Sequence, residues 1–154
     1  MGLTPREIFE ELITPDIFDH IVKNSTRYAI RDKNQAAFTF SEKELKTFIG
    51  ILIISSYHLV PAERDYWSNE EDLGLDIVKR AMPRDRYLKI KQMLHFCNNE
   101  NSLGNKSDSG LKLRPFIAML QKNFIECGNF ETHVVVYEIV LKYFGKIYLD
   151  LRIV

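Results

Sequence analysis

Six basic residues of this sequence have the side-chain type and the spacing needed to bind phosphate groups. They form two groups: Arg84, Arg86, Lys89 and Lys91 in one segment, and Lys112 and Arg114 in a later one. Both segments have helical apolar spacing, so each group would present cations on a helix surface or at a helix start, where they could meet an anionic partner. The alternative for both groups is an ordinary solvated helix surface.

The overall charge limits what such a site can be. Lys and Arg together number 21, as do Asp and Glu, so the formal net charge is zero. A neutral protein lacks the strong positive field that attracts nucleic acid without specificity. Any nucleic-acid site is therefore expected to be a local patch.

The cysteines and the apolar runs exclude other classes. Cys97 and Cys127 lie far apart and outside any zinc-ligand spacing, so we expect reduced thiols in an intracellular protein, with neither a zinc site nor a disulfide. The longest apolar run, 48–54, is far shorter than the ~20 residues that span a bilayer, and the first residues lack the features of a signal peptide. A soluble protein with no membrane partner is expected.

Capping residues mark the first three helices. Thr4 with Glu7, and Ser41 with Glu44, have the spacing of capping boxes, and Thr14 followed by a proline marks another start. The first two helices are predicted to be short, and 31–37 to be a loop. The helix after Ser41 is apolar almost all round, so we expect it to be central and packed on several sides.

The segment 63–99 is predicted to organise the chain. It contains the only tryptophan, Trp67, which together with Tyr66 is more typical of a packing anchor than of a stacking platform for bases. A short helix over 73–81 and a basic helix beginning at Pro83 follow. In the second of these, four residues are predicted to share the buried face: Tyr87, Ile90, Leu94 and Cys97.

The last third of the chain changes character. Residues 98–110 are rich in loop formers and predict a polar linker, and a further amphipathic helix ends near Gly128. From residue 131, a β-branched run and an alternating segment predict two strands with a turn near Gly145. The predicted fold class is therefore mainly α: a multi-helix domain over 1–130, then the first strands of an incomplete α/β domain over 131–154.

Several motifs in fixed order resemble the piggyBac transposases and the piggyBac-derived proteins of animal genomes. They read ERDYWS, then DIVKRAMPRDRYLKIKQMLHFCNN, KLRPF and VYEIVLKYFGK, and the likeness runs from about residue 4 to residue 146. The resemblance implies a helical dimerisation and DNA-binding region over 1–130, the start of an RNase H-like catalytic domain over 131–154, and a nuclear location. In that family three aspartates hold Mg²⁺ to cut and join DNA.

The resemblance also indicates where catalysis is missing. On the family segment V-D-E-x-M-V-x-F-x-G-R, the catalytic aspartate falls on Tyr137 and the next acid on Glu138. A phenol with an ordinary pKa of about 10 is a poor Mg²⁺ ligand, and Glu138 would point to the opposite face of the strand. Asp150 is no replacement, because a lone acid in an alternating strand is most often solvated. We therefore expect no catalytic residues, no bound metal and no other cofactor.

The predicted function is that of a non-catalytic, transposase-derived protein that retains a DNA-binding and dimerisation scaffold. The family pattern is lost after Lys146, so a truncated or altered form is expected. Candidate partners are DNA, a second copy of the chain, and a related transposase-like protein. The alternative is a protein-interaction module that pairs with itself or with an intact relative, or a degenerate fragment without a selected role.

Overall fold

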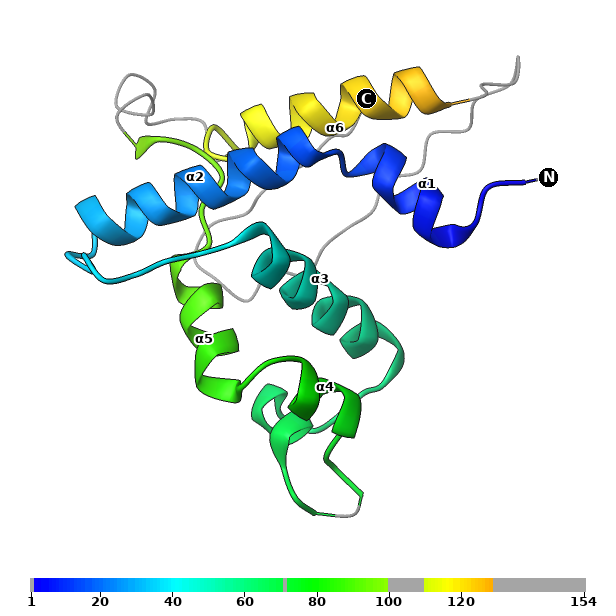
Figure 1. Cartoon of the computed structure of the whole chain (residues 1–154), viewed down its shortest axis with the longest axis vertical. Helices are drawn as coiled ribbons and strands as arrows, with labels where there is room; N and C mark the ends of the chain where they lie inside the picture. The colour runs from blue at the N-terminus through cyan, green and yellow to red at the C-terminus, as the bar shows by residue number, and fades with distance from the viewer. Residues whose placement is uncertain (1, 71, 100–109, 129–154) are drawn as a thin grey trace. The chain divides into compact units, whose positions relative to one another are not determined.

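The computed structural model describes residues 2–70, 72–99 and 110–128, which fall into two compact units. One unit combines residues 1–17 with the chain from residue 96 onward, and the other comprises residues 18–95. The first unit contains α1 (Pro5–Leu12) and α6 (Arg114–Cys127). The second contains α3 (Glu42–Tyr57), the 3-10 helix η1 (Glu63–Trp67), α4 (Asp76–Ala81) and α5 (Arg84–Met93), while α2 (Pro15–Arg31) begins in the first unit and continues into the second (Figure 1).

The described residues are mainly helical and include no strand, which confirms the mainly α class. The strands predicted within 131–154 and most of the predicted loop 98–110 lie outside the described residues. Within the described part of the chain, no helix is both long and apolar enough to cross a membrane.

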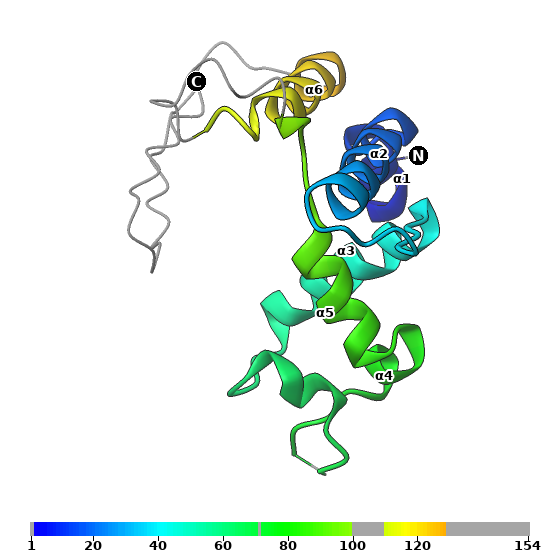
Figure 2. The ribbon, with the colours of Figure 1, turned by 90° about the vertical axis from the view of Figure 1, so that its left-hand side faces the viewer.

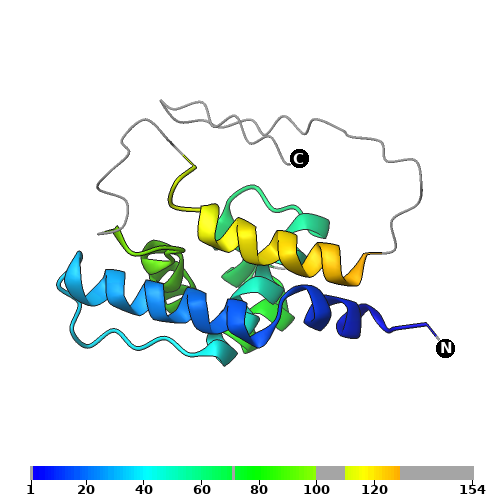
Figure 3. The same ribbon diagram turned by 90° about the horizontal axis from the view of Figure 1, so that it is seen from above.

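The first unit is built on the pairing of α1 with α6, which lie side by side in Figure 3. The predicted capping box begins α1: the Thr4 hydroxyl accepts the Glu7 backbone N–H, and the Glu7 carboxylate accepts the Thr4 backbone N–H. At the other end of α1, the Asn123 side-chain amide donates to the Leu12 carbonyl at 2.9 Å. A side chain of α6 therefore satisfies a carbonyl that the end of α1 leaves open.

Helix α2 is longer than the short helix predicted from its apolar residues. Its buried stripe begins with Ile17, Phe18 and Ile21 but continues through a polar residue, Ser25, to Ala29. The Ser25 hydroxyl accepts the His95 backbone N–H at 3.0 Å and donates to the His95 carbonyl at 3.3 Å. Hydrophobic spacing could not reveal the second half of this helix, because a hydrogen-bonded serine fills the buried face there.

Helix α3 begins with the predicted Ser41–Glu44 capping box, but the prediction that it packs on several sides is wrong. Only Leu45, Phe48 and Ile51 are buried, and they lie on one side of the helix. Ile53 is 46% exposed, and the Tyr57 side chain at the helix end is 86% exposed. An apolar helix therefore leaves one face uncovered in this unit.

The anchor interpretation of Tyr66 and Trp67 is confirmed, and both residues lie in η1. Tyr66 is buried and donates its hydroxyl to the His58 carbonyl. The Trp67 indole N–H donates to the Met82 carbonyl at 2.8 Å, and its ring centroid lies 5.0 Å from that of Tyr87. Tyr66 thus ties η1 to the end of α3, and Trp67 ties η1 to Met82 and α5.

Helices α4 and α5 are each shorter than predicted. Helix α4 begins at Asp76, and the preceding Gly74 passes so close to the Ser68 carbonyl that a Cβ at Gly74 would clash with its oxygen. Helix α5, beside α3 in Figure 2, ends at Met93, so its buried face consists of Tyr87, Ile90 and Met93. Leu94 and Cys97, predicted to share that face, lie beyond the helix.

Candidate nucleic-acid interface

Helix α5 positions four of the six predicted phosphate-binding residues. It begins directly after Pro83, and its three buried residues turn toward the core of the unit. Arg84, Arg86, Lys89 and Lys91 are therefore left on its other faces, as the sequence predicted. Their value for DNA binding depends on which groups of the protein they already contact.

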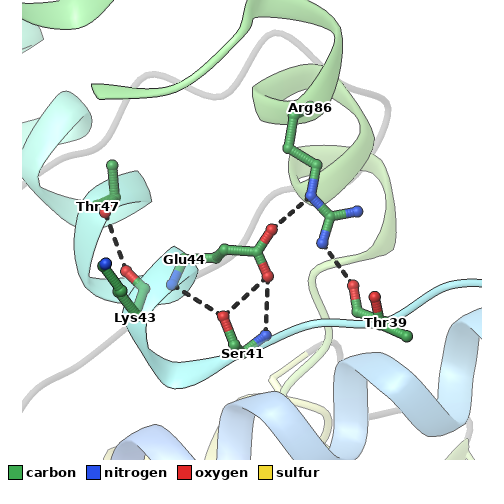
Figure 4. A network of polar contacts seen from close by, with 6 residues as sticks. All are labelled: Thr39, Ser41, Lys43, Glu44, Thr47 and Arg86. Carbon is green, nitrogen blue, oxygen red and sulfur yellow. Dashed lines mark hydrogen bonds and ion pairs between the residues drawn. The ribbon is translucent and has the colours of Figure 1, made fainter. Parts of the chain in front are cut away.

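Arg86 is used inside the unit. Its Nε donates to Glu44 Oε1 at 2.7 Å and its terminal nitrogen donates to the Thr39 carbonyl (Figure 4). The Arg86 side chain is only 29% exposed and its guanidinium lies 5.3 Å from the ring centroid of Phe38. Arg86 thus connects α5 with the segment that leads into α3.

The same carboxylate serves the cap of α3. The Oε2 atom of Glu44 accepts the Ser41 backbone N–H at 3.0 Å and the Ser41 hydroxyl at 2.9 Å (Figure 4). The hydrogen bond from Arg86, with a smaller contribution from those of Ser41, lowers the pKa of Glu44 below its ordinary value against the opposing effect of burial. Glu44 is therefore at once the acid of the capping box and the partner of Arg86.

Lys91 belongs to a second contact group. Its ammonium lies 2.6 and 2.7 Å from the two carboxylate oxygens of Glu63 in η1. The Tyr87 hydroxyl donates to the same carboxylate at 3.0 Å. Burial, reinforced by Glu63, raises the pKa of Tyr87 above its usual range, so the phenol stays a donor. Lys91 nevertheless keeps 52% of its side chain exposed.

The remaining two cations of α5 differ in whether their partner is distant or adjacent in the sequence. The Lys89 ammonium donates to the Gln35 side-chain oxygen at 3.0 Å, which fastens the loop after α2. Arg84 forms an ion pair with its neighbour Asp85, at 3.1 Å, and is 51% exposed. On α5, Arg84 and Lys91 are therefore the cations with the largest exposed fraction, and Arg86 and Lys89 serve mainly to hold the unit together.

Lys112 and Arg114 belong to the first unit. Arg114 is the first residue of α6, Lys112 precedes it, and both residues are exposed. The two groups of predicted residues thus lie in different units.

Sequence reasoning missed the acceptors of the α5 cations. Glu44 was interpreted only as a capping residue, and Glu63 and Gln35 received no role. The one available signal was the equal number of acidic and basic residues, which implies that many cations find acidic partners. The pairing itself is invisible in the sequence because Arg86 and Glu44 are 42 residues apart.

The predicted loss of metal chemistry concerns residues that the structure does not describe. Tyr137, Glu138 and Asp150 all lie outside the described residues. Among the residues that are described, no group of three or more His, Cys, Asp or Glu side chains could hold a metal ion. The chemical argument therefore rests on Tyr137 alone: a neutral phenol does not fit the magnesium site that the family resemblance implies.

Comparisons with known proteins place these elements among transposases. A family model described as Transposase IS4 matches residues 4–150. The human piggyBac transposable element-derived proteins 3 and 2 are each 34% identical over 143 residues, or 93% of this chain, which covers 23% and 24% of their lengths. The human chimeric ERCC6-PGBD3 protein is also 34% identical over 93% of this chain, and the matched segment is 13% of the length of that protein. No solved structure matches the chain.

Proposed function

Because the chain belongs to the family described as Transposase IS4 and is similar to piggyBac-derived proteins, we propose that it is a non-catalytic protein providing a helical binding scaffold. The observation that carries the scaffold role is the polar network of the 18–95 unit. Partners from other segments bind three of its cations, Arg86, Lys89 and Lys91. Among the described residues, every buried side-chain nitrogen or oxygen has a hydrogen-bond partner. A degenerate fragment would be expected to leave such groups unsatisfied.

The non-catalytic part of the proposal rests on Tyr137. A DDE-type transposase holds Mg²⁺ with carboxylates beside the scissile phosphate, and the family pattern puts this phenol where the first of them is expected. The chain also spans about a quarter or less of the relatives it matches, so the activity of a whole transposase is not assigned to it.

DNA is the first candidate ligand of the scaffold. Support comes from Arg84 and Lys91, whose side chains keep about half of their surface exposed, and from the exposed Lys112. Surface ion pairs such as these contribute little free energy, so a phosphate can replace the carboxylate partner. The neutral net charge limits this binding to low salt and to few phosphate contacts.

A gel-shift experiment with a labelled duplex in Mg²⁺ buffer tests both parts of the proposal. The full chain is expected to retard the duplex at low salt and to leave it uncut. Arg84→Gln and Lys112→Gln are each expected to weaken binding and to lower the salt slope by about 1, as the loss of one phosphate contact does.

The matched control for the gel shift is Lys23→Gln, which removes one exposed cation of α2 outside both predicted groups. It is expected to leave the binding unchanged. Failure to retard any duplex at low salt would exclude DNA as the ligand. Cleavage that depends on Mg²⁺ and is lost in Tyr137→Phe would contradict the non-catalytic assignment.

Pairing with another protein is the second candidate role, and one observation favours it. The uncovered face of α3 exposes apolar side chains, including Ile53, on a helix that is otherwise part of the core. Exposed apolar patches on soluble proteins commonly mark interaction surfaces.

A further inference from the structure

Lys79 in α4 is a partly buried cation with a long ion pair. Its side chain is 26% exposed, and among the described residues its ammonium pairs only with Asp76, at 3.8 Å. Three other lysines lie 2.6 to 2.7 Å from their carboxylates although their side chains are more exposed: Lys23, Lys46 and Lys91. A charge that is partly removed from water normally has a close partner of opposite sign. A further anion near Lys79 would therefore be stabilised at this position.

The Lys79 ammonium lies near Ser68, across Gly74. A Cβ at Gly74 would clash with the Ser68 carbonyl oxygen and would also lie 2.6 Å from Lys79 Nζ. The Ser68 carbonyl and the end of the Lys79 side chain therefore flank the same point. Because Gly74 has no side chain, the Lys79 side chain can extend over it toward Ser68. An anion attached to the Ser68 side chain would lie within reach of the Lys79 ammonium.

The Ser68 hydroxyl is available to carry such an anion. Ser68 follows η1 directly in an extended conformation and is half-buried. Its hydroxyl oxygen accepts the Glu70 backbone N–H at 3.1 Å, and within the described part of the chain the hydroxyl donates to no acceptor. Its proton is therefore not held by another group of the protein.

The residues after Ser68 have the charge pattern of a substrate for an acid-directed kinase. Three acids follow it, two, three and four positions later in the sequence: Glu70, Glu71 and Asp72. Kinases distinguish substrates by such patterns, since a basic substrate groove attracts acids beside the acceptor hydroxyl. Ser41 is also followed by acids, but its hydroxyl donates to the Glu44 carboxylate at 2.9 Å in the cap of α3. Ser68 is therefore the better acceptor of the two.

We propose that Ser68 is a phosphorylation site for an acid-directed protein kinase and that Lys79 binds the added phosphate. Ser68 Oγ forms a bond to the γ-phosphorus of ATP while the bond from that phosphorus to the β-phosphate oxygen breaks, so ADP leaves. The hydroxyl proton passes to a carboxylate of the kinase. The phosphate carries up to about two negative charges, which makes it a stronger acceptor for the Lys79 ammonium than the Asp76 carboxylate is. The new contact fastens the residue after η1 to α4.

Phosphorylation of the full chain by a purified acid-directed serine kinase, with ATP as the phosphate donor, tests the site. Peptide mass spectrometry is expected to locate the phosphate on Ser68, and Ser68→Ala is expected to lower the total incorporation at least five-fold. The matched control is Ser56→Ala, which changes an exposed serine of α3 that no acid follows within six residues. It should leave the incorporation unchanged. A wild type without phosphate on Ser68, or equal incorporation in Ser68→Ala, overturns the proposal.

Titration of the phosphorylated chain by phosphorus NMR tests the role of Lys79. A nearby ammonium favours the phosphate dianion, so the second pKa of the phosphate, ordinarily about 6, is expected to be lowered in the wild type. Lys79→Gln is expected to raise this pKa by roughly one unit. The matched control, Arg80→Gln, removes a cation of the same helix that also pairs with Asp76 at 3.8 Å but is 83% exposed. It should leave the phosphate pKa nearly unchanged.

A phosphate pKa that Lys79→Gln leaves unchanged, or that both variants raise equally, overturns Lys79 as the partner of the phosphate. If Lys79→Gln fails to fold, the wild type decides the question alone. Unfolding it in urea is then expected to raise the phosphate pKa, and equal values in the folded and unfolded chain contradict the contact. Neither measurement involves DNA, so phosphorylation of Ser68 and the proposed DNA-binding scaffold can fail independently.

Discussion

Tyr87→Ala is expected to destabilise the 18–95 unit by about 3–5 kcal/mol, the range for removing a large buried aromatic side chain. Tyr87 is 2% exposed, and its ring lies 4.9 Å from that of Phe48 and 5.0 Å from that of Trp67. The substitution therefore removes the ring that joins α5, α3 and η1. Urea unfolding followed by the fluorescence of the single tryptophan measures the loss.

The matched variant is Tyr87→Phe, which keeps the ring and removes only the hydroxyl that donates to Glu63. Its expected cost is about 1 kcal/mol, the net value of one hydrogen bond. Equal losses in the two variants would mean that the hydroxyl rather than the ring stabilises the unit. A loss below about 1 kcal/mol in Tyr87→Ala would contradict the packing role of the ring.

Arg86→Met is expected to destabilise the same unit by about 2 kcal/mol, because it leaves the Glu44 carboxylate and the Thr39 carbonyl without their donor. Arg84→Met removes the same charge from the same helix at a position 51% exposed, and its expected cost is about 0.5 kcal/mol or less. The comparison distinguishes a structural arginine from a surface one. Equal effects on stability would show that the contact with Glu44 contributes nothing.

The pH dependence of the stability difference between wild type and Arg86→Met is an internal control. Glu44 has a folded-state pKa below its ordinary value of 4.5, so its contribution is fully present above that pH and is lost as the pH falls through the folded value. The stability gap between wild type and Arg86→Met should therefore be constant near neutral pH and shrink below about pH 4.5. A gap that persists at lower pH would assign the effect instead to the contacts of Arg86 with the Thr39 carbonyl and the Phe38 ring.

The sequence predicted well the features that depend on neighbouring residues. Both capping boxes, at Thr4 and at Ser41, are present because a side chain and a backbone group three residues apart determine them. The packing role of Tyr66 and Trp67 followed from residue type. The extent of α2 could not be predicted in this way, because the buried Ser25 is satisfied by hydrogen bonds to His95, seventy residues away.

Contacts between distant residues also limited what the sequence could predict about the candidate site. The sequence identified the cations of α5 and placed them outside the apolar face, which the structure confirms for that helix. It could not tell that Arg86 is committed to Glu44 whereas Arg84 is not, because the difference arises only when α3 and α5 pack together. The roles of Tyr137, Lys112 and Arg114 stay predictions.

The division into units has a consequence for the order of folding. The first unit joins α1 to α6 across the whole intervening segment, so that Leu12 and its donor Asn123 are 111 residues apart. The 18–95 unit is continuous in sequence and needs no such distant partner. Because closing a long loop is entropically costly and domains generally fold as they emerge during synthesis, residues 18–95 are expected to fold first. Helix α1, the first to be synthesised, would then be among the last to reach its native packing.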